Sequence, residues 1–298
     1  MALRTRKATG EVAFPMLLVE GGEKAGKTFT ALQLAASERV GRTFVLELGE
    51  RAADEYAALG RHEILDHNGT YSDIKDQLRE AAAVPAEDGK PNVITFDSGS
   101  IGWDLLKDAA STSARNSKRA RKILEDDPDA DIEVTMPYWT KAKDKWWDLI
   151  RPLRMWPGIT VITCRAGEVA KVVNGQPVAN QTEWARNIEK GTPFAMTGIV
   201  RVGYPKPPTL VAVQSLHLTL PHGGLILPEQ QTLEHLVFEL LGGGRQFGQS
   251  PVVEPIAGLS GIDAKNGLWA DACDYLQRDL AKVAAAKAWA AAGLDGKA

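Results

Sequence analysis

Short apolar runs alternate with segments of helical spacing along most of this chain. Each run has the length of a buried strand, and each intervening segment carries apolar residues three or four positions apart, as a packed helix face does. The predicted strands are Met16–Val19, Arg42–Leu48, Ile64–Leu65, Asn92–Ser98 and Gly158–Cys164. The predicted helices are Thr28–Glu38, Ala52–Leu59, Tyr71–Ala83, Ile101–Ala110 and Tyr138–Met155. This alternation predicts an α/β fold whose central sheet is mostly parallel and flanked by helices.

The pattern changes after Cys164. Residues 166–193 are polar, with turn signals at Asn174-Gly175 and near Pro193, so we predict a long loop that is functional or disordered. The remaining elements make a β-rich edge and a closing helix: a hairpin of Thr197–Val202 with Thr209–Val213, edge strands within Leu216–Leu227, and a helix over Thr232–Leu241.

Composition shifts divide the chain into parts. Residues 1–13 are polar and basic and are expected to form a flexible arm, and residues 14–241 form the α/β core. Residues 242–262 are rich in Gly, Pro and Ser and read as a linker. Residues 263–298 are predicted to form a helical C-terminal tail, whose apolar stripe would require the core, another protomer or another protein as partner.

The totals of the 298 residues exclude several classes of protein. No apolar run reaches about 18 residues, so no membrane span is expected. The N-terminus lacks the apolar segment of a secretory signal, and two distant cysteines indicate a reducing compartment, so we expect a cytoplasmic protein. Net charge is −3, so contact with nucleic acid requires a local basic patch.

Between the first strand and the first helix lies the pattern G-x-x-x-x-G-K-[ST], typical of a phosphate loop. Glycines let the backbone wrap an anion, and the N–H groups at the helix start point at phosphate. Lys27 is expected to reach the β- and γ-phosphates of ATP, and the Thr28 hydroxyl to bind Mg²⁺. The alternative is an ordinary glycine turn before a helix. The predicted nucleotide-binding residues are Gly21, Gly22, Glu23, Lys24, Ala25, Gly26, Lys27, Thr28 and Phe29.

The strand Asn92–Ser98 ends in an acid, Asp97, as a Walker B strand does. Ligands of α/β sheets bind at the carboxyl ends of strands, so Asp97 is predicted to hold Mg²⁺ together with Thr28. An apolar run that ends in Asp is also a common strand exit, and the preceding phosphate loop favours the metal-binding interpretation.

Hydrolysis requires a group that orients water, and we expect it on a strand next to the phosphate loop. Glu47 and Glu50, at the end of the second strand, are the candidates, although surface glutamates are common at such positions. Arg165 follows the strand Gly158–Cys164 and either senses the γ-phosphate or caps a carboxylate.

Five basic residues lie within eight positions and precede the acid-rich stretch 125–131: Arg115, Lys118, Arg119, Arg121 and Lys122. The run is either a solvated loop that pairs with the acidic stretch or an arm that contacts a phosphate backbone. In the helix Tyr138–Met155, tryptophans interleave with lysines. Their helical spacing favours core packing over base stacking.

GGEKAGKT, VITFDS and FVLELGERAADEYAALG follow one another in an order that resembles the RecA-type recombinase ATPase core. Residues 12–241 are most similar to the core-only phage ATPases of single-strand annealing, the Sak-four-like group. On this comparison Glu50 fits the family's catalytic glutamate better than Glu47, if one residue is inserted. Arg165 stands where the family often carries a Gln or His switch residue, and residues 111–135 and 166–193 stand where recombinases bind DNA.

The resemblance implies a slow, DNA-stimulated Mg·ATPase that binds and anneals single-stranded DNA in phage recombination, in the cytoplasm of a bacterial host. It implies a homo-oligomeric ring or filament, with nucleotide between protomers. The resemblance leaves the tail unexplained; a single-strand binding protein or other replication proteins are candidate partners for it, above all if the chain is a switch or scaffold. Two alternatives stay open: another P-loop enzyme, such as a packaging motor or a nucleotide kinase, and a non-hydrolysing ATP-dependent switch or scaffold.

Overall fold

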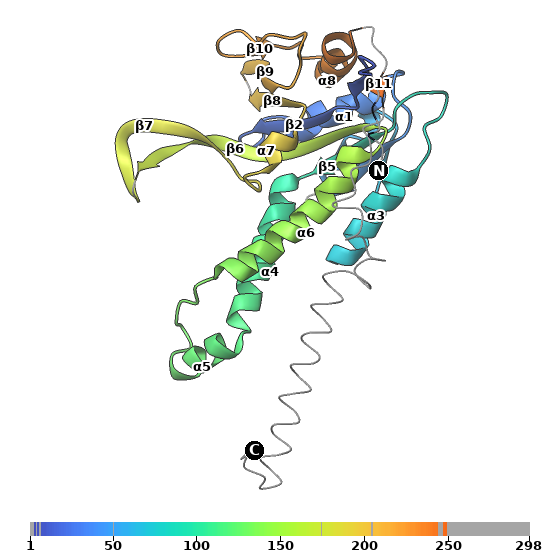
Figure 1. Cartoon of the computed structure of the whole chain (residues 1–298). Helices are drawn as coiled ribbons and strands as arrows, with labels where there is room; N and C mark the ends of the chain where they lie inside the picture. Colours follow the sequence, from blue (N-terminus) through green and yellow to red (C-terminus); the bar gives the residue numbers. More distant parts are fainter. Residues whose placement is uncertain are drawn as a thin grey trace. The chain divides into compact units, whose positions relative to one another are not determined.

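The structure is a computed structural model that describes residues 3, 5, 7–49, 51–173, 175–203, 205–243 and 247–248 (Figure 1). All of these belong to the first of two compact units, Met1–Ser250. The second unit is Pro251–Ala298. The predicted tail 263–298 and most of the predicted linker 242–262 therefore lie outside the described residues.

A mixed sheet forms the centre of the first unit. Its strands lie in the order β10 (Leu225–Ile226), β9 (Lys206–Val213), β8 (Gly198–Gly203), β2 (Met16–Gly21), β6 (Ile159–Val173), β5 (Val93–Asp97), β3 (Thr43–Glu47) and β4 (His62–Ile64). The strands from β8 to β4 are parallel to one another. β9 pairs antiparallel with β8, and β10 pairs antiparallel with β9. Every residue of β2 and β5 is buried, as expected of parallel strands covered on both faces.

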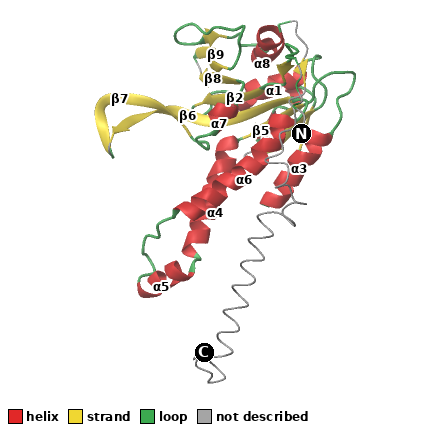
Figure 2. Ribbon diagram, viewed as in Figure 1, coloured by secondary structure: helices red, strands yellow, loops and turns green. Residues whose placement is uncertain are grey.

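Helices cover both faces of this sheet (Figure 2). The helical elements are α1 (Lys27–Leu32) with a 3₁₀ extension (Gln33–Ala36), α2 (Ala52–Glu55) with a 3₁₀ turn (Ala57–Leu59), α3 (Tyr71–Ala83), α4 (Gly99–Arg115), α5 (Lys118–Asp126), α6 (Met136–Met155), α7 (Thr192–Ala195), and α8 (Thr232–Glu234) with a π-helical extension (His235–Gly242). Residues of α3, α4 and α6 pack in one apolar cluster, and residues of α1 and α8 pack in another. The predicted α/β architecture, with a central sheet between helices, is confirmed.

Trp146 of α6 lies at the centre of the first cluster. Its side chain is fully buried, and its Nε1 donates to Thr192 Oγ1 at 2.8 Å. Its ring contacts Trp103 edge-to-face at a centroid distance of 6.0 Å and lies 5.9 Å from Phe96. For this tryptophan the core-packing interpretation is confirmed, since a buried indole is not available to stack on a base.

The predicted loop 166–193 is wrong. Strand β6 continues to Val173 and turns at Gly175 into β7 (Gln176–Arg186), forming an antiparallel ribbon that projects from the sheet (Figure 1). Gly175 has a φ of +79°, as the residue after Asn in a tight hairpin turn requires. Most of the ribbon is exposed on both faces, so its strands lack the apolar alternation by which a half-buried strand is recognised.

The basic run is not a loop either. Arg115 is the last residue of α4, and the other four basic residues lie in α5, which begins after Ser117. The Ser117 hydroxyl accepts from Ala120 N–H at 3.1 Å and so caps α5. Helices α4 and α6 extend together beyond the sheet and carry α5 at their far end (Figure 1).

The ends of the core also differ from the predicted bounds. β1 (Val12–Ala13) pairs in parallel with β11 (Phe247–Gly248), so structured residues occur within the predicted basic arm and within the predicted linker. In the described part of the chain, no helix combines the length and the apolar character needed to cross a membrane.

Candidate functional site

The glycine loop connects β2 to α1. A Cβ atom at Gly21 would lie 2.3 Å from the carbonyl oxygen of Val202, so this position requires glycine. Gly26, immediately before α1, has a φ of +85°. Strand, loop and helix therefore follow one another as a phosphate loop requires, with the first amides of α1 at the end of the loop.

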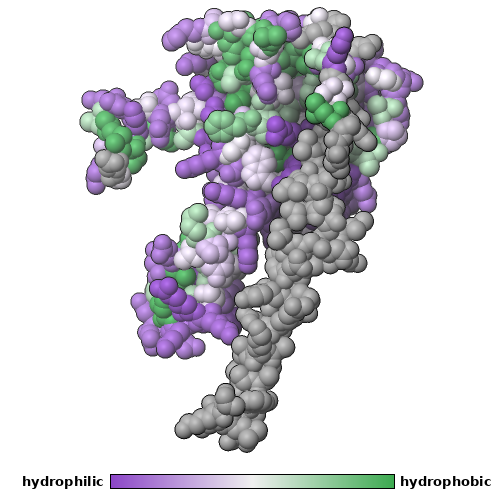
Figure 3. All heavy atoms as spheres, in the orientation of Figure 1, coloured by the Kyte–Doolittle hydropathy of each residue, from purple (hydrophilic) through white to green (hydrophobic). Residues whose placement is uncertain are grey.

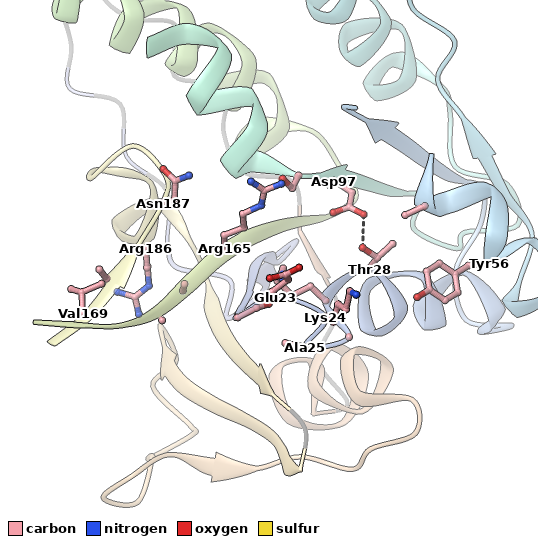
Figure 4. A pocket seen from close by; sticks show the side chains of 18 residues that line it. Glu23, Lys24, Ala25, Thr28, Tyr56, Asp97, Arg165, Val169, Arg186 and Asn187 are labelled. Carbon is pink, nitrogen blue, oxygen red and sulfur yellow. Dashed lines mark hydrogen bonds between the residues drawn. The ribbon is translucent and has the colours of Figure 1, made fainter. Parts of the chain in front are cut away.

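The first two side chains of α1, those of Lys27 and Thr28, make hydrogen bonds at the glycine loop. Lys27 Nζ donates to the carbonyl oxygen of Gly22 at 2.6 Å, which keeps the ammonium group within the glycine loop. The Thr28 hydroxyl donates to Asp97 Oδ2 at 2.7 Å (Figure 4). The predicted proximity of Thr28 and Asp97 is confirmed.

Asp97 ends β5 and is buried. Its Oδ1 accepts a hydrogen bond from Thr163 of β6. β6 lies between β2 and β5, so a threonine from the intervening strand and a threonine from α1 fix both carboxylate oxygens. The peptide bond between Asp97 and Ser98 is cis, and Ser98 Oγ caps α4 by accepting from Ile101 N–H.

The expected position of the glutamate-bearing strand is wrong. β6 and β5 separate β3 from β2, so Glu47 lies beside Asp97 and not beside the phosphate-loop strand. Glu47 Oε1 accepts from Ala53 N–H at 3.0 Å and so fixes the start of α2. Glu47 also borders, with Asp97 and Ser98, a cavity of about 10 Å³, close to the size of one water molecule. Glu50 lies outside the described residues.

Arg165 lies within β6, not after it. Its amide donates to Ser100 Oγ at 2.7 Å, which ties β6 to α4, and its exposed side chain lines the cavity above the glycine loop. Burial raises the pKa of the preceding Cys164 thiol to about 11, against the opposing effect of a hydrogen bond with Ser100. Cys164 is therefore a packing residue with a protonated thiol at neutral pH.

A cavity of about 960 Å³ lies over the glycine loop (Figure 4). Residues 22–28, Asp97 and Ser98 form its floor. Tyr56 lies at one end, and Arg165 and Arg186 lie toward the other. The cavity thus has an aromatic end and a cationic end, with the loop between them.

Sequence reasoning missed two groups of residues here. Tyr56 forms an edge-to-face pair with the partly exposed Phe29 at 6.1 Å and offers an aromatic face beside the loop. Glu20, the residue before Gly21, is fully buried and bonded to Arg186 and Arg201. The signal in the sequence was a glutamate inside an apolar strand, because a buried carboxylate requires charged or hydrogen-bonding partners.

The basic run Arg115, Lys118, Arg119, Arg121 and Lys122 is exposed throughout. Among the ion pairs of the described residues, none joins it to the acid-rich stretch 125–131. Figure 3 shows hydrophilic side chains over much of this projecting region. None of its residues lines the cavity, and α5, which holds four of them, lies at the far end of the projecting helices (Figure 1).

Comparisons with known proteins add little to this geometry. No protein-family model matches the chain, and neither does any curated protein. One solved structure that aligns is a prototypical ATPase from the type III secretion system of pathogenic bacteria, at 13% identity and a TM-score of 0.32. The alignment covers 64% of this chain and 51%, about half, of that protein.

Proposed function

We propose that this chain is a P-loop ATPase that binds Mg·ATP over the loop Gly21–Thr28. One observation carries the proposal: the hydroxyl that follows the loop lysine donates to the carboxylate ending β5, on the floor of a 960 Å³ cavity. Drug-sized ligands occupy cavities of about 300–1,000 Å³, so the cavity has room for a nucleotide.

The cavity offers a contact for each part of ATP. The loop amides and Lys27 would hold the phosphates, and the aromatic face of Tyr56 would stack on the base. In the described structure Lys27 Nζ donates to Gly22, a contact that a bound phosphate would replace.

The residues also fit Mg²⁺. This ion prefers oxygen ligands and is commonly held by one or two carboxylates together with substrate phosphates and water. Thr28 Oγ1 and Asp97 Oδ2, 2.7 Å apart, are such oxygens, and within the described residues no cluster of three acidic, His or Cys side chains offers a separate cage. Bound there, Mg²⁺ would neutralise charge that develops on the phosphates.

Hydrolysis requires a base that orients water. Glu50 is proposed for this role on the family resemblance. Glu47 is the alternative, because it borders the small cavity beside Asp97 while Ala53 N–H holds its carboxylate in place.

The finer proposal is a RecA-like phage recombination protein that binds and anneals single-stranded DNA. The order of motifs along the chain supports it, together with five exposed cations on the projecting helices. We further propose a ring or filament of protomers, and recruitment of a replication protein by residues 263–298.

The test is ATP turnover by the full chain with and without single-stranded DNA. Wild type is expected to hydrolyse ATP, faster with DNA, and Lys27→Ala to lose binding or turnover. Neutralising all five cations of the basic run should weaken DNA binding and flatten its salt dependence, because each lost phosphate contact lowers the number of released counterions. A wild-type protein that binds ATP without turnover would instead be a nucleotide-dependent switch. If the variant that lacks all five cations binds DNA as wild type does, the basic run is not the DNA-binding site.

A control neutralises two cations elsewhere on the surface. Lys75 and Arg79 of α3 are suitable, because α3 lies apart from α5 (Figure 1) and neither residue lines the cavity. This variant should bind DNA as wild type does.

A further inference from the structure

Two arginines converge on Glu20 directly beneath the phosphate loop. Arg201 of β8 donates from Nε and Nη2 to Glu20 Oε1 at 2.9 and 2.8 Å. Arg186, the last residue of β7, donates from Nε to Glu20 Oε2. Glu20 is fully buried and immediately precedes Gly21. The cluster holds two positive charges and one negative charge.

Arg201 is the fixed member of this cluster. Its guanidinium carbon lies 3.8 Å from the ring centroid of Trp184, so the cation stacks on the indole while its two N–H groups hold the carboxylate. Both arginines belong to strands, but only Arg186 lines the cavity. Glu20 would therefore remain paired with Arg201 if the Arg186 side chain left it for the cavity.

The position of Arg186 along the cavity is set by the ribbon. Tyr56 and Arg186 lie at opposite ends of the cavity, with the loop between them (Figure 4). A nucleotide whose base stacks on Tyr56 and whose phosphates lie on the loop directs its terminal phosphate toward the cationic end.

We propose that Arg186 binds the terminal phosphate of ATP, and that it exchanges its contact with Glu20 for the phosphate when ATP binds. This inference rests on the proposed nucleotide site. An arginine binds phosphate through charge-assisted N–H···O bonds, and phosphate competes with the Glu20 carboxylate for the same donors. Because Arg201 continues to neutralise Glu20, the exchange leaves no buried charge without a partner.

The exchange would move the base of the ribbon. Arg186 ends β7, and the next residue, Asn187, donates to Asp104 of α4 at 2.9 Å. Asp104 in turn pairs with Lys107 at 2.6 Å. A shift of Arg186 is therefore transmitted to the β6–β7 ribbon and to α4, the helix that leads to the basic run. ATP and ADP are expected to differ in their effect on both.

The test compares the affinities of the full chain for Mg·ATPγS and Mg·ADP, measured by calorimetry. Arg186→Gln should weaken ATPγS binding about ten- to a hundredfold, the loss typical of a charge-assisted hydrogen bond, and change ADP binding less than about threefold. Arg186→Lys should recover part of the loss, because it restores the charge. Lys171→Gln, which removes one charge from the same ribbon, is the control and should match wild type.

Hydrogen exchange supplies a second readout on the same proteins. In wild type, ATPγS should change the exchange rates of amides in 166–170 and 182–187 several-fold more than ADP does, and Arg186→Gln should abolish the difference. Equal losses of ATPγS and ADP affinity, or none, would overturn the role of Arg186. Failure of wild type to bind either nucleotide would instead overturn the nucleotide site itself.

Discussion

Asp97→Asn separates metal binding from folding more cleanly than any other change in the site. The substitution keeps the shape of a buried side chain that accepts hydrogen bonds from Thr28 and Thr163. The amide oxygen can still accept from one threonine, and the amide nitrogen can donate to the other, because a hydroxyl rotates to suit its partner. What the variant loses is the negative charge.

The two consequences differ in size. For folding, two hydrogen bonds to a carboxylate become two weaker bonds to a neutral amide, but a buried charge is no longer desolvated, so the net cost in the free energy of unfolding is about 1 kcal/mol. Loss of the carboxylate removes at least one charge-assisted interaction with the metal or its water, about 1.5–3 kcal/mol. This corresponds to a loss of about ten- to a hundredfold in the Mg²⁺ dependence of ATP binding.

Nucleotide affinity measured across a Mg²⁺ titration checks the prediction, with urea denaturation as the folding control. Asp108→Asn, an exposed acid on α4, is the matched variant and should behave as wild type. If Asp97→Asn binds ATP with the wild-type Mg²⁺ dependence, the proposed metal site is wrong.

Three further predictions concern other residues. Glu50→Gln should bind Mg·ATP and lose turnover in an ATPase assay. Glu47→Gln, which keeps an acceptor for Ala53 N–H, should hydrolyse ATP normally. The reverse outcome would make Glu47 the residue that orients the attacking water. Trp146→Phe should lower the free energy of unfolding, measured in urea, by about 2–4 kcal/mol, because it leaves the buried Thr192 hydroxyl without its donor and a gap beside the ring. An unfolding midpoint unchanged from wild type would contradict the packing argument. The pKa of Cys164 is raised from its usual 9.0 to about 11, so the folded chain retains a proton that the unfolded chain loses; stability should be complete below about pH 9 and fall by roughly 2–3 kcal/mol toward pH 11, and Cys164→Ala should lack that part of the slope.

The sequence by itself placed the elements whose residues interact locally. The helix Tyr71–Ala83 has the predicted bounds, because its spacing and the Thr70 cap both lie within the segment. The glycine loop and Asp97 were also identified, since a loop between strand and helix and an acid at a strand end are local patterns. Their meeting at 2.7 Å followed from the rule that parallel strands present their carboxyl ends at one edge.

Local patterns failed where exposure or long-range pairing decides the structure. The β6–β7 ribbon has solvent on both faces, so nothing in its sequence alternates as a half-buried strand does. Strand order put β6 and β5 between β2 and β3, which moved Glu47 away from the phosphate-loop strand.

Only the tertiary structure brought together Glu20, Arg186 and Arg201. These arginines lie 166 and 181 positions from Glu20 along the chain. The sequence places a glutamate between the apolar run Met16–Val19 and the glycine loop, and the fold buries it. Desolvation then requires that this charge be paired. Only the fold decided which cations pair with it: Arg201 lies on β8, which pairs with β2, and Arg186 ends β7, which pairs with β6 on the other side of β2. A side chain can reach only the strands that the fold places near it.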